Sequence, residues 1–310
     1  MRIGLTYNLK PAGATGDQYE EFDSVETIES LEAAMRANGH EPVRLGWGRE
    51  MLDALEREQV DGVFNIAEGV GGRSRESQVP ATLEMLGIPC SGSDAVAIGI
   101  TLDKALAKLL ARSGGIATAP WEVLHNQREV VLRFPLFAKP AAEGSSMGIT
   151  ATSRCETPDE LKAAVDRLLP YGPVLVEEYL PGDEYTVGIV DGEVIGVMQV
   201  VPITTEEHFI YSIEVKRDYL NRVRYRFLEA PDVATVALSV WRAFGLRDVA
   251  RVDIRRDRAG VPNFVEVNPL PGVHPVNSDL IILARGFGWT YEQLIGRVVA
   301  AAEKRWRASQ

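Results

Sequence analysis

Two segments near the end of the chain, in which polar and apolar residues alternate, constrain its fold more than any other feature. In residues 251–254, Arg251 and Asp253 share one face of a strand; in residues 264–268, Glu266 and Asn268 share a face in the same way. A hairpin of these strands brings the two polar faces together. Side-chain oxygens of Asp, Glu and Asn suit Mg2+ that also binds nucleotide phosphates. The pattern therefore predicts a metal site, the alternative being a solvated face of an edge hairpin.

The first hundred residues alternate short apolar strands with amphipathic helices, which indicates a parallel sheet covered on its faces. Strands are expected at residues 3–7, 42–45 and 61–66, and Ser24 is expected to cap a helix that ends at Asn38-Gly39. The third strand runs into a Gly-rich loop, and ligand sites in such sheets lie at these carboxyl ends. No GxGxxG follows the first strand, which argues against a nicotinamide oxidoreductase.

Beyond a boundary placed near residue 95 the pattern changes to short strands with fewer helices. Strands at residues 174–178, 185–190 and 194–201 have hairpin-like spacing, and Asp191-Gly192 is a strong turn signal. Helices are expected at residues 103–112, at 159–169 and from Thr290. The predicted fold class is α/β, with an N-terminal doubly wound parallel sheet (residues 1–95) followed by two units with antiparallel sheets (residues 96–180 and 181–310).

Composition excludes several classes of protein. The 310 residues are 45% hydrophobic and 25% charged, as in ordinary globular proteins. A formal net charge of -11 argues against nucleic acid or an anionic membrane as the main partner. No stretch reaches the roughly 18 apolar residues of a membrane span, so a cytoplasmic protein is expected. Two cysteines cannot build a disulfide framework.

A lysine followed by small residues marks a second candidate site. Lys139 ends a predicted strand, and the loop 140–148 is rich in Gly, Ala and Ser. Backbone N–H groups of such a loop can cradle phosphate oxygens while the lysine supplies a charge. The loop is not a Walker A sequence, since GxxxxGK[ST] is absent, and taken alone it is equally compatible with an ordinary loop.

Residues 174–184 form a third candidate site. An extended hinge between two sheets can offer backbone groups to an adenine edge, with Leu180 against its face and Glu184 near the ribose hydroxyls. A surface strand that ends in an acidic turn has the same pattern, so this segment is a weak signal by itself.

Together and in this order, these motifs resemble the D-alanine-D-alanine ligase branch of the ATP-grasp superfamily. The resemblance covers nearly the whole chain and is carried by TLDK at 101–104, AKPAAEGSSMG at 138–148, EEYLPGDE at 177–184, EVK at 214–216, RVD at 251–253 and FVEVNPLPG at 264–272. It implies an ATP-dependent acid–amine ligase that forms an acyl-phosphate and then an amide, most simply D-alanyl-D-alanine for peptidoglycan. It also implies two Mg2+ ions, replaceable by Mn2+, small amino-acid substrates and a homodimer.

The resemblance implies a role for each residue that matches a family motif. Arg251 and the N–H of Gly272 would form the oxyanion site, Ser278 would hold the second substrate's carboxylate, and Ser145 and Ser146 would belong to a lid. The first substrate's ammonium would be held by Glu20, Glu21 or Glu26, of which Glu21 is favoured. The nucleotide and its metal ions would be held by the remaining matched residues: Lys104, Lys139, Glu177, Leu180, Glu184 and Lys216 for ATP, and Asp253, Glu266 and Asn268 for Mg2+.

The chain departs from the family pattern at positions that face the substrates. Glu68 stands where the family presents a histidine, and Arg217 follows Lys216 where an aromatic residue is usual. The cluster 73–78 either reads a substrate carboxylate or forms surface ion pairs. Two alternatives therefore stay open: a ligase for other amino acids or peptides, and a nucleotide-binding homologue without turnover.

Overall fold

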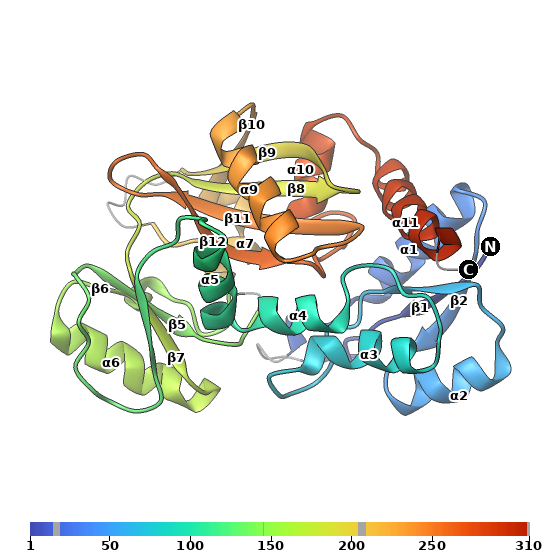
Figure 1. Ribbon diagram of the computed structural model, residues 1–310, viewed down its shortest axis with the longest axis horizontal. Helices are drawn as coiled ribbons and strands as arrows, with labels where there is room; N and C mark the ends of the chain where they lie inside the picture. The colour runs from blue at the N-terminus through green and yellow to red at the C-terminus, as the bar shows by residue number, and fades with distance from the viewer. Residues whose placement is uncertain (15–18, 145, 204–208, 309–310) are drawn as a thin grey trace.

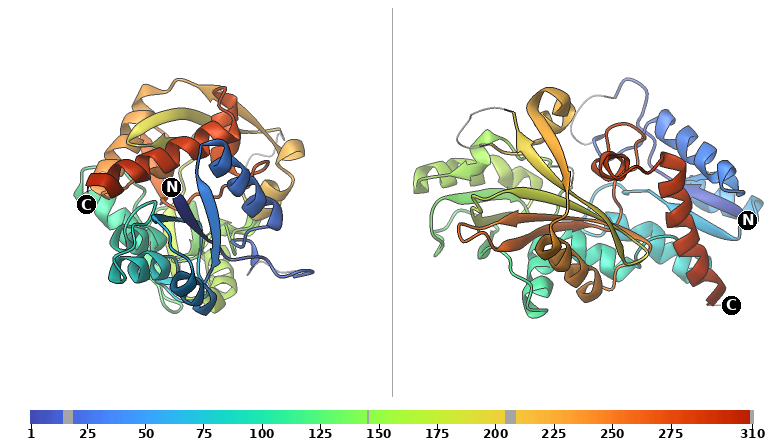
Figure 2. Two further views of the ribbon diagram at one scale, coloured as in Figure 1. Left: turned by 90° about the vertical axis from the view of Figure 1, so that its right-hand side faces the viewer. Right: turned by 90° about the horizontal axis from the view of Figure 1, so that it is seen from above.

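Three β-sheets follow one another along the chain and are joined by helices (Figure 1). The computed structural model describes residues 1–14, 19–144, 146–203 and 209–308. The first sheet lies at one end of the molecule, the four-stranded sheet lies at the other end, and the five-stranded sheet lies between them (Figures 1 and 2).

The N-terminal sheet is parallel, with strand order β2-β1-β3, and helices cover both of its faces. Ile3 and Leu5 pack against one layer of helices, whereas Val63 packs against the other, as expected for parallel strands buried on both sides. The doubly wound parallel sheet predicted from the sequence is therefore confirmed. Its elements are β1 (Arg2–Thr6), α1 (Val25–Ala37), β2 (Glu41–Gly46), α2 (Arg49–Arg57), β3 (Gly62–Asn65), η2 (Arg75–Ser77) and α3 (Gln78–Met85).

The predicted cap of the first helix is present. The Ser24 side chain accepts a hydrogen bond from the Thr27 N–H at 3.1 Å, and Asn38 ends the helix. A serine at this position satisfies one of the unpaired N–H groups of the first turn.

A four-stranded sheet of order β4-β7-β5-β6 follows two consecutive helices. Helix α6 packs on it through Leu161, Val165 and Leu168. The elements are α4 (Ala95–Leu102), α5 (Lys104–Ser113), β4 (Trp121–Leu124), β5 (Leu136–Pro140), η3 (Ala151–Ser153), β6 (Arg154–Cys155), α6 (Pro158–Leu168), η4 (Leu169–Tyr171) and β7 (Val174–Glu178).

The predicted hairpin-like succession of strands 174–178 and 185–190 is wrong. Strand β7 pairs with β4 and β5, whereas β8 (Glu184–Val190) belongs to the next sheet. The intervening residues cross from one sheet to the other, which is the extended hinge expected for this segment. Hairpin spacing alone cannot distinguish a tight turn from a crossing of the same length.

The third sheet is antiparallel, with order β10-β9-β8-β11-β12. The turn between β8 and β9 has positive φ angles at Asp191 (51°) and Gly192 (77°), the conformation expected of an Asp-Gly hairpin turn. Helices α4, α5 and α9 bury apolar side chains against this sheet. The remaining elements are β9 (Glu193–Pro202), α7 (Ile213–Arg217), α8 (Tyr219–Arg222), β10 (Val223–Leu228), α9 (Pro231–Ala243), β11 (Val249–Arg256), β12 (Pro262–Asn268), α10 (Asp279–Gly286) and α11 (Tyr291–Ala308).

The end of the chain returns to the N-terminal sheet. Helix α11 lies beside α1 (Figures 1 and 2). Leu294, Ile295 and Val298 share one apolar core with Ile3 and Leu5. This core links the first and last parts of the chain and so fixes the N-terminal sheet relative to the five-stranded sheet. Within the described residues no helix is both long enough and apolar enough to cross a bilayer.

Candidate active site

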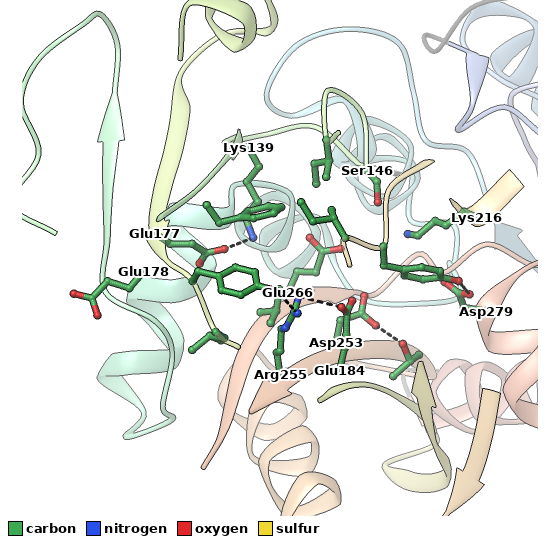
Figure 3. Close-up of a pocket in the computed structure, with 18 residues that line it drawn as sticks. Lys139, Ser146, Glu177, Glu178, Glu184, Lys216, Asp253, Arg255, Glu266 and Asp279 are labelled. Carbon is green, nitrogen blue, oxygen red and sulfur yellow. Dashed lines mark hydrogen bonds and ion pairs between the residues drawn. The ribbon is translucent and has the colours of Figure 1, made fainter. Parts of the chain in front are cut away.

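Two neighbouring cavities are lined by most of the residues that the sequence singled out; Glu26 and, of the cluster 73–78, all residues but Glu76 are not part of the lining. The first, of about 800 Å³, lies between the four-stranded and five-stranded sheets, and Figure 3 shows its lining. The second, of about 1820 Å³, reaches from there to the N-terminal sheet. Lys216, Glu266, Tyr211 and Asp279 line both, so the two cavities adjoin. Ser145 lies outside the described residues.

The first cavity has apolar lining from the hinge residue Leu180 and the strand residues Phe137 and Val265, together with charged groups. Lys139, Glu177 and Glu184, predicted to contact the nucleotide, all line it, as does Ser146, whose φ is 59°. Such a mixed lining can take an aromatic base against its apolar side chains and phosphates beside its lysines.

Glu177 lies between two buried lysines. Its Oε1 is 2.7 Å from Lys139 Nζ, and its Oε2 is 2.6 Å from Lys108 Nζ. Burial alone would raise the pKa of Glu177, but the two lysines lower it to about 2. The carboxylate is thus engaged on both oxygens, and it holds Lys139 in place beside the cavity.

Glu184 and the hinge are held by a second ion pair. Arg255 Nη1 lies 3.3 Å from Glu184 Oε2, and the same guanidinium donates to the Tyr179 hydroxyl at 2.8 Å and lies over its ring. Burial raises the pKa of Glu184. These contacts tie β8, β11 and the hinge together on the floor of the cavity (Figure 3).

The predicted hairpin of acidic strands is present, and its register places the candidate ligands together. Asp253 is the direct partner of Glu266, and Arg251 is the partner of Asn268. Asn268 Nδ2 lies 3.5 Å from Asp253 Oδ2, and Thr186 Oγ1 donates to Asp253 Oδ1 at 2.9 Å. Opposed residues of an antiparallel pair have Cβ atoms about 5 Å apart, within reach of one cation.

The charges on this hairpin suit a hard divalent cation. Burial raises the pKa of Asp253, with a further contribution from Glu266. Burial acts in the same direction on Glu266, but Lys104, Lys139 and Lys216 lower the pKa of that carboxyl to about 2. The hairpin thus offers the ionised carboxylate of Glu266, the carboxyl group of Asp253, whose ionised form Glu266 disfavours, and the amide oxygen of Asn268. Such a set of oxygen donors fits Mg2+.

The Arg251 side chain is 13% exposed and is held by two carboxylates. Its Nη2 lies 2.9 Å from Asp253 Oδ2, and its Nη1 lies 3.5 Å from Asp279 Oδ2. The Tyr211 hydroxyl donates to Asp279 Oδ1 at 3.0 Å and lies 2.7 Å from the Tyr225 hydroxyl. Asp279 therefore connects Arg251 to two tyrosines.

Gly272 and Ser278 lie together on one wall of the second cavity. A Cβ added at Gly272 would lie 3.0 Å from Ser278 Oγ, and that hydroxyl accepts a hydrogen bond from the His274 N–H at 2.9 Å. Arg251, Asn268 and Lys104 line the same cavity. Lys104 Nζ lies 3.8 Å from Glu266 Oε2 and hydrogen-bonds the Glu143 carbonyl, so it lies between the cation site and the loop after β5.

Of the three candidate glutamates for an ammonium group, the structure places two in the cavity lining. The Glu21 side chain is 9% exposed, and its Oε2 lies 3.2 Å from Arg75 Nη2. Glu20 pairs with Arg217 at 2.6 Å, and Glu26 points toward His274 at the surface. The Arg217 side chain is 49% exposed, which places it at the mouth of the cavity.

Both arginines of the cluster 73–78 pair with carboxylates of the protein itself. Arg73 pairs with Asp103 at the surface, whereas Arg75 is buried and pairs with Glu21 and, at 3.5 Å, with Glu143. Glu76 also lines the second cavity, close to Glu68.

Sequence reasoning missed four residues of this site: Lys108, Tyr211, Arg255 and Asp279. Lys108 follows Lys104 by one helical turn, on the same face of α5, and that spacing was the only local signal. Asp279 and Tyr211 contact Arg251 or its partners through pairings between segments far apart in sequence.

Comparison with known proteins agrees with this geometry. The family model described as D-ala D-ala ligase C-terminus matches residues 110–300, more than half of the chain. A D-alanine–D-alanine ligase of Glaesserella parasuis is 34% identical over 287 residues, covering 89% of this chain and 92% of that protein. The uncharacterized protein y4sG of Sinorhizobium fredii is 32% identical over 298 residues, covering 90% and 88%.

A solved structure extends the likeness to the whole fold. The D-alanine–D-alanine ligase from Bacillus anthracis, complexed with ATP, superposes with a TM-score of 0.78 over 100% of both chains at 24% identity. At that identity the match shows the fold, and the family rests on the sequence matches. On these matches, the chain belongs to the D-alanine–D-alanine ligase family.

Proposed function

We propose that the protein is an ATP-dependent carboxylate–amine ligase that releases ADP and phosphate. The observation that carries this proposal is the position of Lys104, Lys216 and Glu266 where a cavity suited to a nucleotide meets a larger polar cavity. A phosphoryl group transferred at this junction would meet positive charge on one side and an acceptor on the other.

In the first step, a substrate carboxylate oxygen attacks the terminal phosphorus of ATP, and the bond to the ADP oxygen breaks. Lys104, Lys139 and Lys216 would offset the negative charge on the transferring group. Asp253, Glu266 and Asn268 would hold two Mg2+ ions, or Mn2+ in their place, whose chemistry is to neutralise phosphate charge and align the reacting groups. The product is an acyl-phosphate.

In the second step, an amine attacks the activated carbonyl, and phosphate leaves with the electron pair of the broken C–O bond. Arg251 and the Gly272 N–H would stabilise the oxyanion, where losing one donor raises the barrier by about 3 kcal/mol. Ser278 would hold the carboxylate of the second substrate and Glu21 the ammonium of the first. The loop after β5, which carries Ser146, would limit the entry of water.

The simplest substrate pair is two molecules of D-alanine, with D-alanyl-D-alanine for peptidoglycan as the product. Support comes from the relatives that bear this activity in their names and from the ligase-like arrangement of Arg251, Gly272 and Ser278. A cytoplasmic homodimer belongs to the same proposal. A second candidate, a ligase for another amino acid, is favoured by the carboxyl groups of Glu68 and Glu76 in the substrate cavity.

ADP release, measured with MgATP and D-alanine and then with a panel of D- and L-amino acids, tests the proposal. Mass spectrometry of the product should show one amide for each ADP released. ADP without any amide, or no ADP release with any acid–amine pair, would contradict it and would favour a nucleotide-binding homologue without turnover.

A further inference from the structure

One wall of the second cavity brings three carboxyl groups close together. Carboxylate oxygens of Glu21, Glu68 and Glu76 lie within 4.8 Å of one another. Asp23 lines the same cavity. Of the three clustered glutamates, only Glu21 has an ion-pair partner among the described residues. That partner is Arg75.

We call Glu21, Glu68 and Glu76 together the acidic wall. Glu76 is its most deeply buried member. Its side chain lines the cavity although the residue is only 8% exposed. In the part of the chain that the structure describes, neither Glu76 nor Glu68 accepts a hydrogen bond or forms an ion pair. A buried carboxylate without a partner is costly, so such a group is normally matched by a bound cation or neutralised by a proton.

The position of the acidic wall relates it to the substrates. It shares a cavity with Arg251, Gly272 and Ser278, the residues proposed to hold the reacting groups. The α-ammonium of one amino acid would be matched by Glu21, whose charge Arg75 already offsets in part. Among the described residues, Glu68 and Glu76 then remain without an ion-pair partner, and Arg75 and Lys104 act on Glu76 only from beyond ion-pair distance.

We propose that Glu68 and Glu76 form a subsite for a second cationic nitrogen on the amino-acid substrate, so that the enzyme prefers a diamino acid to alanine. This inference rests on the proposed ligase function and narrows its substrate class. An –NH3+ group donates at about 2.8 Å and can hold its acceptors up to roughly 4.6 Å apart, which suits the spacing of the acidic wall.

The free state of the wall is consistent with a cation that arrives with the substrate. Burial, with the neighbouring carboxylates Glu76, Glu21 and Asp23, raises the pKa of Glu68 well above its ordinary value. Burial raises the pKa of Glu76 to about 7 against the opposing effect of Arg75 and Lys104. Arg75, beside the wall, also makes it less suited to a small divalent ion than to a directional ammonium donor.

The test compares diamino acids with neutral amino acids of equal length, using the full chain with MgATP. The probes are the D- and L-forms of 2,4-diaminobutyrate and ornithine, with norvaline and norleucine as neutral counterparts. We expect kcat/KM for ADP release to favour one diamino acid by at least about 10-fold, and Glu76→Gln to reduce that preference about 10-fold. Glu84→Gln, an exposed change on α3, should leave the preference unchanged.

Binding measured without turnover separates this inference from the ligase assignment. Calorimetric titration of the same amino acids into the protein with a non-hydrolysable ATP analogue should show the same preference, weakened in Glu76→Gln and in Glu68→Gln. Diamino-acid binding without ADP release would overturn the ligase and leave the subsite. ADP release with D-alanine but no diamino preference would overturn the subsite alone. A Mg2+ site lost in Glu76→Gln, with no diamino preference, would make the wall a metal site and overturn the subsite.

Discussion

Lys108 Nζ lies 2.6 Å from Glu177 Oε2, and the lysine is completely buried. The other carboxylate oxygen pairs with Lys139, so Glu177 connects a lysine within the protein to one that lines the nucleotide cavity. Thr118 lies 2.6 Å from the same Lys108 nitrogen. Lys108 therefore acts on the site through Glu177, and the two lysines should differ in what their removal changes.

Lys108→Met should lower the free energy of unfolding by about 3 kcal/mol, because it leaves a buried carboxylate with one partner instead of two. Lys139→Met should also destabilise the fold, but in addition it should reduce kcat by at least about 100-fold by removing a phosphate contact. Denaturant unfolding and ADP release measure the two effects. Lys162→Met, an exposed change on α6, is the control. Equal effects of both variants on turnover would show that Lys139 acts only through the fold.

Glu266→Gln should make nucleotide binding nearly independent of Mg2+. The residue lies opposite Asp253, and substitutions even outside the direct ligands of a metal cost about 10–100-fold in affinity or activity. Calorimetric titration of an ATP analogue with and without Mg2+ measures the difference. A wild-type affinity that chelator leaves unchanged would contradict the metal assignment.

Asp279→Asn should reduce kcat about 10-fold with a change in the KM for ATP of less than about twofold. Asp279 contacts Arg251, the proposed oxyanion donor, and its loss should misplace that donor without removing it. Asp232→Asn breaks an Asp–Arg pair away from both cavities and should leave both constants near wild type. A rise in KM alone would show that Asp279 serves ATP binding instead.

Glu76→Gln should stabilise the free protein more at pH 8 than at pH 5. The pKa of Glu76 is raised to about 7 in the folded state, so between about pH 4.5 and 7 the folded chain binds a proton that the unfolded chain has lost. Stability therefore falls as pH rises through that range, and the amide removes this loss. The gain in Tm should grow by at least about 2 °C, roughly the effect of 1 kcal/mol. Glu84→Gln should show no such trend, and a constant gain would contradict the raised pKa.

Local patterns predicted much of this protein. Alternation on two strands gave the facing pair Asp253 and Glu266, and Ser24 and Asp191 were recognised as a cap and a turn because their chemistry acts within a few residues. The resemblance to a family then supplied roles that spacing alone does not give.

Contacts between segments that are far apart in the sequence could not be predicted from local patterns. The assignment of β7 and β8 to different sheets, the packing of α11 on α1, and the pairing of Lys108 with Glu177 all depend on how separate elements meet. Arg75 is an example. The sequence around this residue is equally compatible with an exposed ion pair and a buried one, and only the fold shows that Arg75 lies against Glu21.

The most direct test of the central claim, an acyl-phosphate on the way to an amide, is the fate of the carboxylate oxygen. The full chain is incubated with MgATP and D-alanine labelled with 18O in both carboxylate oxygens, or with the preferred amino acid of the panel, and the released phosphate is examined by mass spectrometry. One 18O atom in inorganic phosphate for each amide formed is predicted, because the attacking oxygen leaves with the phosphoryl group. Unlabelled phosphate, or label in AMP, would contradict the proposed mechanism.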